Sequence, residues 1–229
     1  MGGSTYEIVP HSRGRRAIAT RLTASMREIP HFYLRRTAVV DELLALRVTL
    51  NEHAPARLSV NDFLLRAVAV AHTQVPEMNV VWTEEGMRRF DSVDIGVAIS
   101  SELGLVSPVL RAVEQQSLSA ISAAVLGFVR QADEGRLRQH DLEGGSISVT
   151  NLGMHGVEEF AAIINPPQSA ILAVGAARPA VRIVDGVPAP VTVVNLVLSV
   201  DHRAIDGTPA ARWMEALVGA LERPLRLLV

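Results

Sequence analysis

The chain has 229 residues, of which 48% are hydrophobic, and its formal net charge is −2 at pH 7. This composition suits one globular domain with a sizeable core, and it favours neither nucleic acid nor an anionic membrane surface as a partner. The chain has no cysteine, and all 22 of its basic residues are arginine. Disulfides, a thiol nucleophile, Cys-ligated metal sites and a lysine carrying a covalent lipoyl group are therefore excluded.

Residues 1–12 lack the basic and apolar regions of a signal peptide and are expected to form a flexible leader. No apolar run reaches the roughly 18 residues of a membrane span. Together with the absence of cysteine, these features lead us to expect a cytoplasmic protein.

The first half of the chain alternates helical and extended patterns. Asp41 is expected to be the N-cap of the second helix, and Pro76 to close the third. In chain order we predict a helix over Arg13–Ile29, an extended segment over Pro30–Leu34, helices over Asp41–Glu52 and Ser59–Thr73, and strands over Val80–Trp82, Asp94–Ser100 and Leu105–Val109.

The second half begins with a long helix and then becomes rich in strands. We predict a helix over Ser117–Gly135, strands over Ser146–Thr150, Ala170–Val174, Val181–Val184 and Val191–Val200, a turn at Asp185–Gly186, and a last helix over Thr208–Leu221. Because helices and strands alternate without strict βαβ repeats, we expect one α/β domain built on a mixed sheet.

The segment Asp201–Gly207 follows the apolar run Val193–Val200 and holds a histidine, an aspartate and a glycine turn. Free imidazole has a pKa of about 6.5, so His202 at a strand end can accept a proton and return it. We predict that His202 is a general base. Asp206 is expected to hold the turn through a partner such as an arginine, or else to orient the ring directly. A buried, hydrogen-bonded histidine is the structural alternative.

A second polar cluster lies in Gly144–Gly156, where Ser146, Ser148 and Thr150 alternate and so share one face of a strand. Thr150 ends this strand before a turn, where its hydroxyl can donate to the oxyanion of a tetrahedral intermediate. Ser146 and Ser148 are expected to be ordinary strand residues that face water.

The other candidates carry less chemistry. Arg13, Arg15 and Arg16 form a basic cluster that could meet the phosphates of a nucleotide-bearing thiol such as coenzyme A, or be a solvated helix end. His31 is expected to pack in the core or against a channel wall, and His155 to be exposed. The remaining histidines, at positions 11, 53, 72 and 140, have no metal-ligand spacing to Asp or Glu, and we expect no metal.

These segments together resemble the catalytic domain of the dihydrolipoamide acyltransferases, the E2 components of 2-oxo acid dehydrogenase complexes. The resemblance extends over residues 13–229 and implies the fold of chloramphenicol acetyltransferase, a mixed-sheet two-layer sandwich that builds trimers. It is carried by Arg15–Leu22, Ile29–Leu34, Ser59–Phe63, Asp94–Ala98, Gly104–Val109, Gly144–Gly156, Ile163–Gly175 and Asp201–Gly207.

The resemblance implies transfer of an acyl group, acetyl in the leading interpretation, between dihydrolipoamide and coenzyme A, as in the pyruvate dehydrogenase complex. His202 would deprotonate the thiol of coenzyme A, and the Thr150 hydroxyl would stabilise the oxyanion, with the two residues on different subunits of a homotrimer. Three departures stand out: Thr150 replaces the usual serine, His155 replaces a common aromatic, and Ser100–Glu102 replaces a Thr-Pro pair.

The resemblance also implies partners that this chain would need. It contains no lipoyl or subunit-binding domain, so the lipoyl group would come from a separate domain or carrier protein, and the E1 and E3 components would bind through the missing domains. We expect either an excised core or a stand-alone transferase. The apolar tail Leu225–Val229 resembles the segment through which family trimers assemble into 24-mer or 60-mer cages; packing on its own trimer is the alternative.

Three competing functions remain open from the sequence. The first is transfer of a small acyl group to the phosphopantetheine thiol of a carrier protein, which uses the same chemistry. The second is an antibiotic O-acetyltransferase, against which the long N-terminal half argues. The third is a non-catalytic oligomeric scaffold, which would not require His202, Asp206 and Thr150 to be intact.

Overall fold

The computed structural model describes residues 5–101, 104–184 and 186–229. The α-helices are α1 (Arg13–Glu28), α2 (Asp41–Asn51), α3 (Val60–Gln74), α4 (Leu118–Asp133) and α5 (Gly207–Glu222). All five confirm a predicted helix, and each end agrees with the prediction to within two residues. None of the helices that the structure describes combines the length and the apolar character needed to cross a lipid bilayer.

The strands form a mixed sheet, as predicted, and two small hairpins. They are β1 (His31–Val39), β2 (Val80–Thr83), β3 (Gly86–Arg89), β4 (Ile95–Val97), β5 (Ile99–Ser101), β6 (Gly104–Val106), β7 (Val109–Leu110), β8 (Ile147–Asn151), β9 (Ala170–Val174), β10 (Arg178–Val184) and β11 (Val187–Asp201). Within the described residues the seven-stranded sheet has the order β1-β11-β9-β8-β4-β7, and β10 pairs with β11. Strands β4, β8 and β9 run parallel, and the other pairs are antiparallel.

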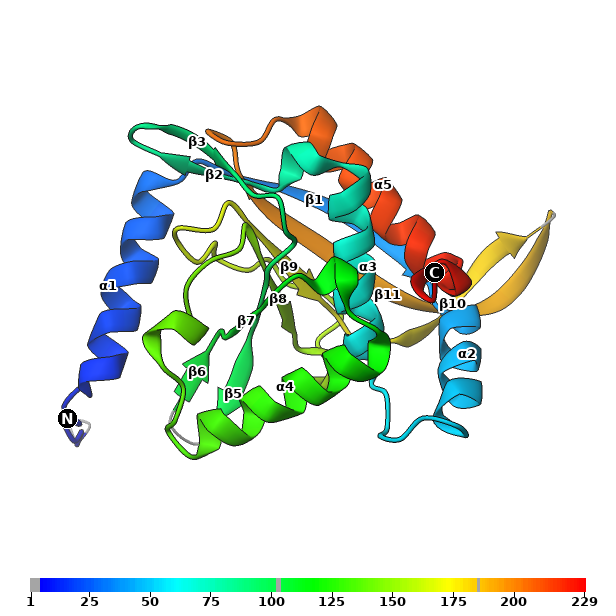
Figure 1. Cartoon of the computed structure of the whole chain (residues 1–229), viewed down its shortest axis with the longest axis horizontal. Coiled ribbons are helices and arrows are strands. Elements are labelled where there is room, and N and C mark those ends of the chain that lie inside the picture. Colours follow the sequence, from blue (N-terminus) through cyan, green and yellow to red (C-terminus); the bar gives the residue numbers. More distant parts are fainter. Residues whose placement is uncertain (1–4, 102–103, 185) are drawn as a thin grey trace.

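Strand β11 organises the sheet. Its first half forms a hairpin with β10 that projects from the body of the molecule, and its buried second half lies between β1 and β9 (Figure 1). Helices α3 and α5 pack side by side over one face of the sheet (Figure 1). The core cluster to which these elements contribute includes the fully buried Phe63, Leu65, Leu172, Leu198 and Trp213.

Two predictions of a single continuous strand are wrong, because in each case the chain forms two short strands. Over Asp94–Ser100 the chain forms β4 and β5, which belong to different sheets, and the intervening Ala98 donates its N–H to the Val149 carbonyl at 2.9 Å. Over Leu105–Val109, β6 ends before Pro108, which has no N–H to donate to a ladder. The breaks let the β5–β6 hairpin leave the main sheet.

Other boundaries also differ. Val40, not Asp41, is the N-cap of α2, because the Asp41 carboxylate instead accepts the Thr192 N–H at 2.9 Å. Strand β3 is exposed and pairs only with β2, so it has no apolar pattern that would predict it. Residues 5–12 form no helix or strand and are exposed, but residues 1–4 of the predicted leader and residue 185 of the predicted turn lie outside the described residues.

A buried chain of hydrogen bonds joins α5, α3 and β8 across the core. The Trp213 indole N–H donates to His72 Nδ1 at 2.9 Å. Nδ1 also lies 3.1 Å from the Val68 carbonyl oxygen, so it accepts from Trp213 only when the ring proton is on Nε2. Nε2 lies 3.4 Å from Ser146 Oγ, which donates to Asn79 Oδ1 at 2.7 Å. This arrangement requires neutral His72, and burial lowers the pKa of its imidazole to about 4.

We expect His72 to make the protein acid-sensitive. The unfolded chain takes up a proton at residue 72 below pH 6.5, whereas the folded protein does so only near pH 4. The free energy of unfolding should therefore fall as the pH drops from 6.5 to 4, by about 3 kcal/mol in total. Urea denaturation at several pH values should show this loss in the wild type and a smaller one in His72→Gln. Equal pH dependence in both proteins would refute the assignment.

Candidate active site

His202 lies in the turn between β11 and α5, and the start of β1 holds it from two sides. Its N–H donates to the Pro30 carbonyl at 3.0 Å, and its ring packs against Phe32 with 4.5 Å between the ring centroids. The His202 side chain is still 51% exposed. The predicted base is therefore oriented but uncovered, so in one chain it faces outward rather than into a closed site.

The turn is held by Asp201, not by Asp206 as predicted. The Asp206 carboxylate is 86% exposed and lies 3.9 Å from His202 Nδ1, which is too far for a hydrogen bond. The Asp201 carboxylate is buried; it accepts the Arg203 backbone N–H at 3.0 Å and pairs with the Arg203 guanidinium at 2.8 Å. Hydrogen bonds to Asp201 raise the pKa of Arg203. The sequence signal for this role was an aspartate directly at the strand end.

We expect these two aspartates to differ in their effect on stability. Asp201→Asn removes charge-assisted hydrogen bonds at a buried position and should lower the free energy of unfolding by about 2 kcal/mol. The matched control Asp206→Asn alters an exposed group and should change it by about 0.5 kcal/mol at most. Chemical denaturation measures both, and a larger loss for Asp206→Asn would contradict this assignment.

Thr150 is half-buried near the end of β8, where it lines a cavity of about 340 Å³. The other residues around it are mainly apolar and include Ile18, Leu22, Leu105, Phe160, Ile163 and Ile171. Such a cavity fits an aliphatic chain, and the hydroxyls of Thr150 and Ser107 are among its few polar groups. His202 is not among the residues that line it.

One chain keeps Thr150 and His202 apart. Thr150 pairs with Ala173 of β9, which pairs with Val197 of β11, and His202 follows five residues later. With about 4.8 Å between strands and about 3.4 Å per residue, the two residues are roughly 20 Å apart in the same chain. They can act on one thioester only if they come from different subunits.

The three arginines at the start of α1 do not reach this cavity. Arg13, Arg15 and Arg16 are exposed, and none of them lines the Thr150 cavity or the neighbouring cavity that shares Arg21 with it. Arg21 does line the Thr150 cavity, together with a neighbouring one that Arg88 also lines, and its guanidinium donates to the Pro166 carbonyl. Arg21 was missed, although it lies on the same helical face as Ile18 and Leu22.

Ser146 and Ser148 do not face water, so that prediction was wrong. Both are buried: Ser146 donates to Asn79, and Ser148 donates to the Gln168 side-chain carbonyl. The reason is that β8 is an inner strand, with β4 and β9 on either side.

His155 is exposed, as predicted. Among the residues that the structure describes, no group of three His, Asp or Glu side chains could hold a metal ion.

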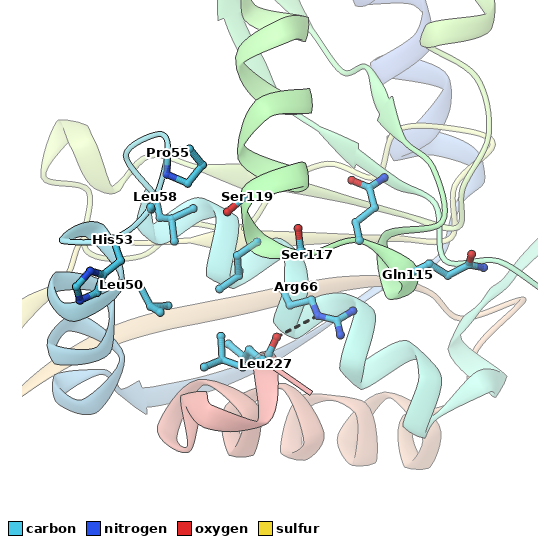
Figure 2. Close-up of a pocket in the computed structure, with 13 residues that line it drawn as sticks. Leu50, His53, Pro55, Leu58, Arg66, Gln115, Ser117, Ser119 and Leu227 are labelled. Carbon is cyan, nitrogen blue, oxygen red and sulfur yellow. Dashed lines mark hydrogen bonds between the residues drawn. The ribbon is translucent and has the colours of Figure 1, made fainter.

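A second cavity, of about 440 Å³, lies beside the C-terminus (Figure 2). It contains none of the predicted site residues. Its lining includes Leu50, His53, Leu58 and Leu227, and Arg66 donates from Nε to the Leu227 carbonyl at 3.2 Å.

Comparison with known sequences places the chain in a family. The family described as 2-oxoacid dehydrogenases acyltransferase (catalytic domain) matches residues 3–229, so the chain belongs to it. It is 40% identical over 98% of its length to the dihydrolipoyllysine-residue acetyltransferase components of the pyruvate dehydrogenase complex from Dictyostelium discoideum and Rhizobium meliloti. The chain spans 36% and 52% of those two proteins, respectively.

Solved structures agree with this assignment. The cubic core of the pyruvate dehydrogenase multienzyme complex superimposes with a TM-score of 0.93 at 32% identity, covering 98% of this chain and 95% of that one. The Azotobacter vinelandii dihydrolipoamide acetyltransferase, studied for the catalytic role of a serine, a histidine and an asparagine, gives 0.92 at 32% identity with the same coverage. Chloramphenicol acetyltransferase, at 0.56 and 14% identity, covers 84% of this chain and 86% of that one, and it shows the predicted fold alone.

Proposed function

We propose that this chain transfers an acetyl group between dihydrolipoamide and coenzyme A, as the catalytic domain of a pyruvate dehydrogenase complex. One observation carries the proposal. In the Azotobacter chain the catalytic serine precedes the histidine by the same number of residues that separates Thr150 from His202, and the asparagine falls at the position of Asp206. Thr150 keeps the hydroxyl of the serine, and Asp206 keeps a side-chain oxygen of the asparagine.

The chemistry needs a base and a hydrogen-bond donor. His202 removes the proton from the coenzyme A thiol, whose pKa of about 8.5 would otherwise leave little thiolate at neutral pH. The thiolate attacks the thioester carbonyl of acetyl-dihydrolipoamide, and the Thr150 hydroxyl donates to the resulting oxyanion. When the carbon–sulfur bond to the lipoyl group breaks, His202 returns its proton to the departing thiolate.

The site requires a homotrimer in which His202 of one chain faces Thr150 of the next. The roughly 20 Å between them within one chain supports this arrangement. The lipoyl group comes from a separate domain or carrier protein, and coenzyme A is a substrate. Arg13, Arg15 and Arg16 stay candidates for its phosphates, while Arg21 and Arg88 are closer to the Thr150 cavity.

A larger assembly involves the C-terminal tail. Leu225, Leu228 and Val229 are 68%, 46% and 93% exposed, next to the cavity of Figure 2, whereas Leu227 is buried in its own chain. Exposed aliphatic residues at one site favour contact with another molecule. Trimers would therefore join into a 24-mer or 60-mer cage, and light scattering separates these sizes from an isolated trimer.

A direct assay tests the proposed reaction. The protein is given acetyl-dihydrolipoamide with either coenzyme A or a phosphopantetheine-bearing carrier protein as acceptor, and new thioester is measured. We expect turnover with coenzyme A. Turnover with the carrier alone would show the biosynthetic alternative, and no turnover with either acceptor would refute acetyl transfer.

A further inference from the structure

One wall of the Thr150 cavity has no regular secondary structure. Residues 157–165, here named the wall segment, form neither helix nor strand, yet Phe160, Ala162, Ile163 and Asn165 all line the cavity. A segment without ladder hydrogen bonds keeps a defined position only if other groups satisfy its backbone. The contacts that do so determine the shape of the cavity.

Three side chains from distant parts of the chain hold the wall segment. His31 Nε2 accepts the Ile164 N–H at 3.1 Å, and Ser25 Oγ donates to the Ile164 carbonyl at 2.7 Å. Ser199 Oγ donates to the Ala162 carbonyl, also at 2.7 Å. Ile164 itself is fully buried in the intact protein, and His31 Nε2 is the hydrogen-bond partner of its N–H.

His31 is held in a single tautomer. Its Nδ1 lies 2.8 Å from the Ile29 carbonyl oxygen, which can only accept, so Nδ1 carries the ring proton. Nε2 is then left as an acceptor, as the Ile164 N–H requires. Both ring nitrogens are therefore committed to the backbone, and the side chain acts as a rigid spacer between α1 and the wall segment.

The same short stretch also supports the base. Pro30 accepts the His202 N–H and Phe32 packs on the His202 ring, while His31 is paired in register with Asp201. Three consecutive residues thus join the wall of the Thr150 cavity to the loop that carries the base. The His31 side chain itself contacts the wall segment, whereas His202 is contacted by Pro30 and Phe32.

We propose that His31 is a positioning residue that sets the wall of the cavity for the thiol substrates. This inference rests on the proposed acetyltransferase function. His31 touches no reacting atom: it acts through Ile164. Displacement of a wall by a fraction of an ångström alters how a substrate is held. We therefore expect a substitution at His31 to change mainly KM.

The test compares His31→Leu, which cannot accept a hydrogen bond, with His31→Gln, whose side-chain carbonyl can. His31→Leu should raise KM for coenzyme A or dihydrolipoamide about tenfold, with kcat within about threefold, and His31→Gln should recover most of the loss. The matched control His11→Leu, at an exposed position in residues 5–12, should leave both constants unchanged. Equal defects in the Leu and Gln variants, or an unchanged KM for both thiols, would overturn the proposal.

A second measurement does not depend on activity. Amide hydrogen exchange across residues 157–165 should speed up about tenfold or more in His31→Leu and return toward wild type in His31→Gln. Exchange unchanged in His31→Leu would overturn the positioning role even if the enzyme is active. If the wild type shows no acetyl transfer, the proposed function fails, while the exchange data still decide whether His31 holds the wall segment.

Discussion

Replacing His202 by alanine is expected to lower kcat for acetyl transfer about 10³- to 10⁴-fold, because no other group in the turn can take the thiol proton. The neighbouring Asp206 is exposed and, as a carboxylate, is a much weaker base than imidazole at neutral pH. Steady-state kinetics with acetyl-dihydrolipoamide and coenzyme A measure this loss. The pH dependence of any residual rate should no longer report an imidazole.

The controls separate chemistry from assembly. The His202 side chain is half-exposed in one chain, so light scattering of the His202→Ala protein should give the wild-type particle size. His155→Ala, which changes another exposed histidine, should keep most of the activity. Unchanged turnover in His202→Ala would refute the base assignment. No turnover in the wild type would favour the non-catalytic scaffold.

Thr150→Val should lower kcat about 10²- to 10³-fold, because valine has the shape of threonine without the hydroxyl that donates to the oxyanion. Thr150→Ser keeps the donor and should stay within a few-fold of the wild type. A raised KM with unchanged kcat in Thr150→Val would contradict the oxyanion role, since that hydrogen bond is made in the transition state and not with the bound substrate.

Mixing the two inactive variants tests whether they act across subunits. If His202 and Thr150 of neighbouring chains form each site, random trimers of His202→Ala and Thr150→Val should regain about a quarter of the wild-type sites. The intact site pairs His202 from a Thr150→Val chain with Thr150 from a His202→Ala chain. No recovery after co-expression would place both residues in the same chain, against the roughly 20 Å that separates them there.

Some predictions succeeded because the signal is local. The helices α2 and α4 follow from apolar residues at helical spacing, and β9 and β11 from apolar runs. The capping box at Ser59 and Asp62 marks the start of α3 in the sequence as in the structure. His202 at the end of β11 needed only a strand and a turn to be recognised.

Other parts of the site depend on segments far apart in the chain. The turn is held by Asp201 and not by the predicted Asp206, because the Arg203 side chain lies against the buried Asp201 carboxylate and the Asp206 carboxylate is exposed. Likewise His31 contacts Ile164 across more than a hundred residues. No periodicity in either segment indicates such a contact.

The amino-acid sequence alone determined the chemistry that this protein can use: an imidazole at a strand end, a hydroxyl at another, and no thiol or lysine amine. It also determined the fold class, because amphipathic periodicity is a property of each segment by itself. Only the tertiary structure decided which groups meet. It buried Ser146 and Ser148, joined His31 to the wall of the Thr150 cavity, and kept Thr150 and His202 on separate parts of one chain, since strand order and register, not sequence spacing, set distances across a sheet.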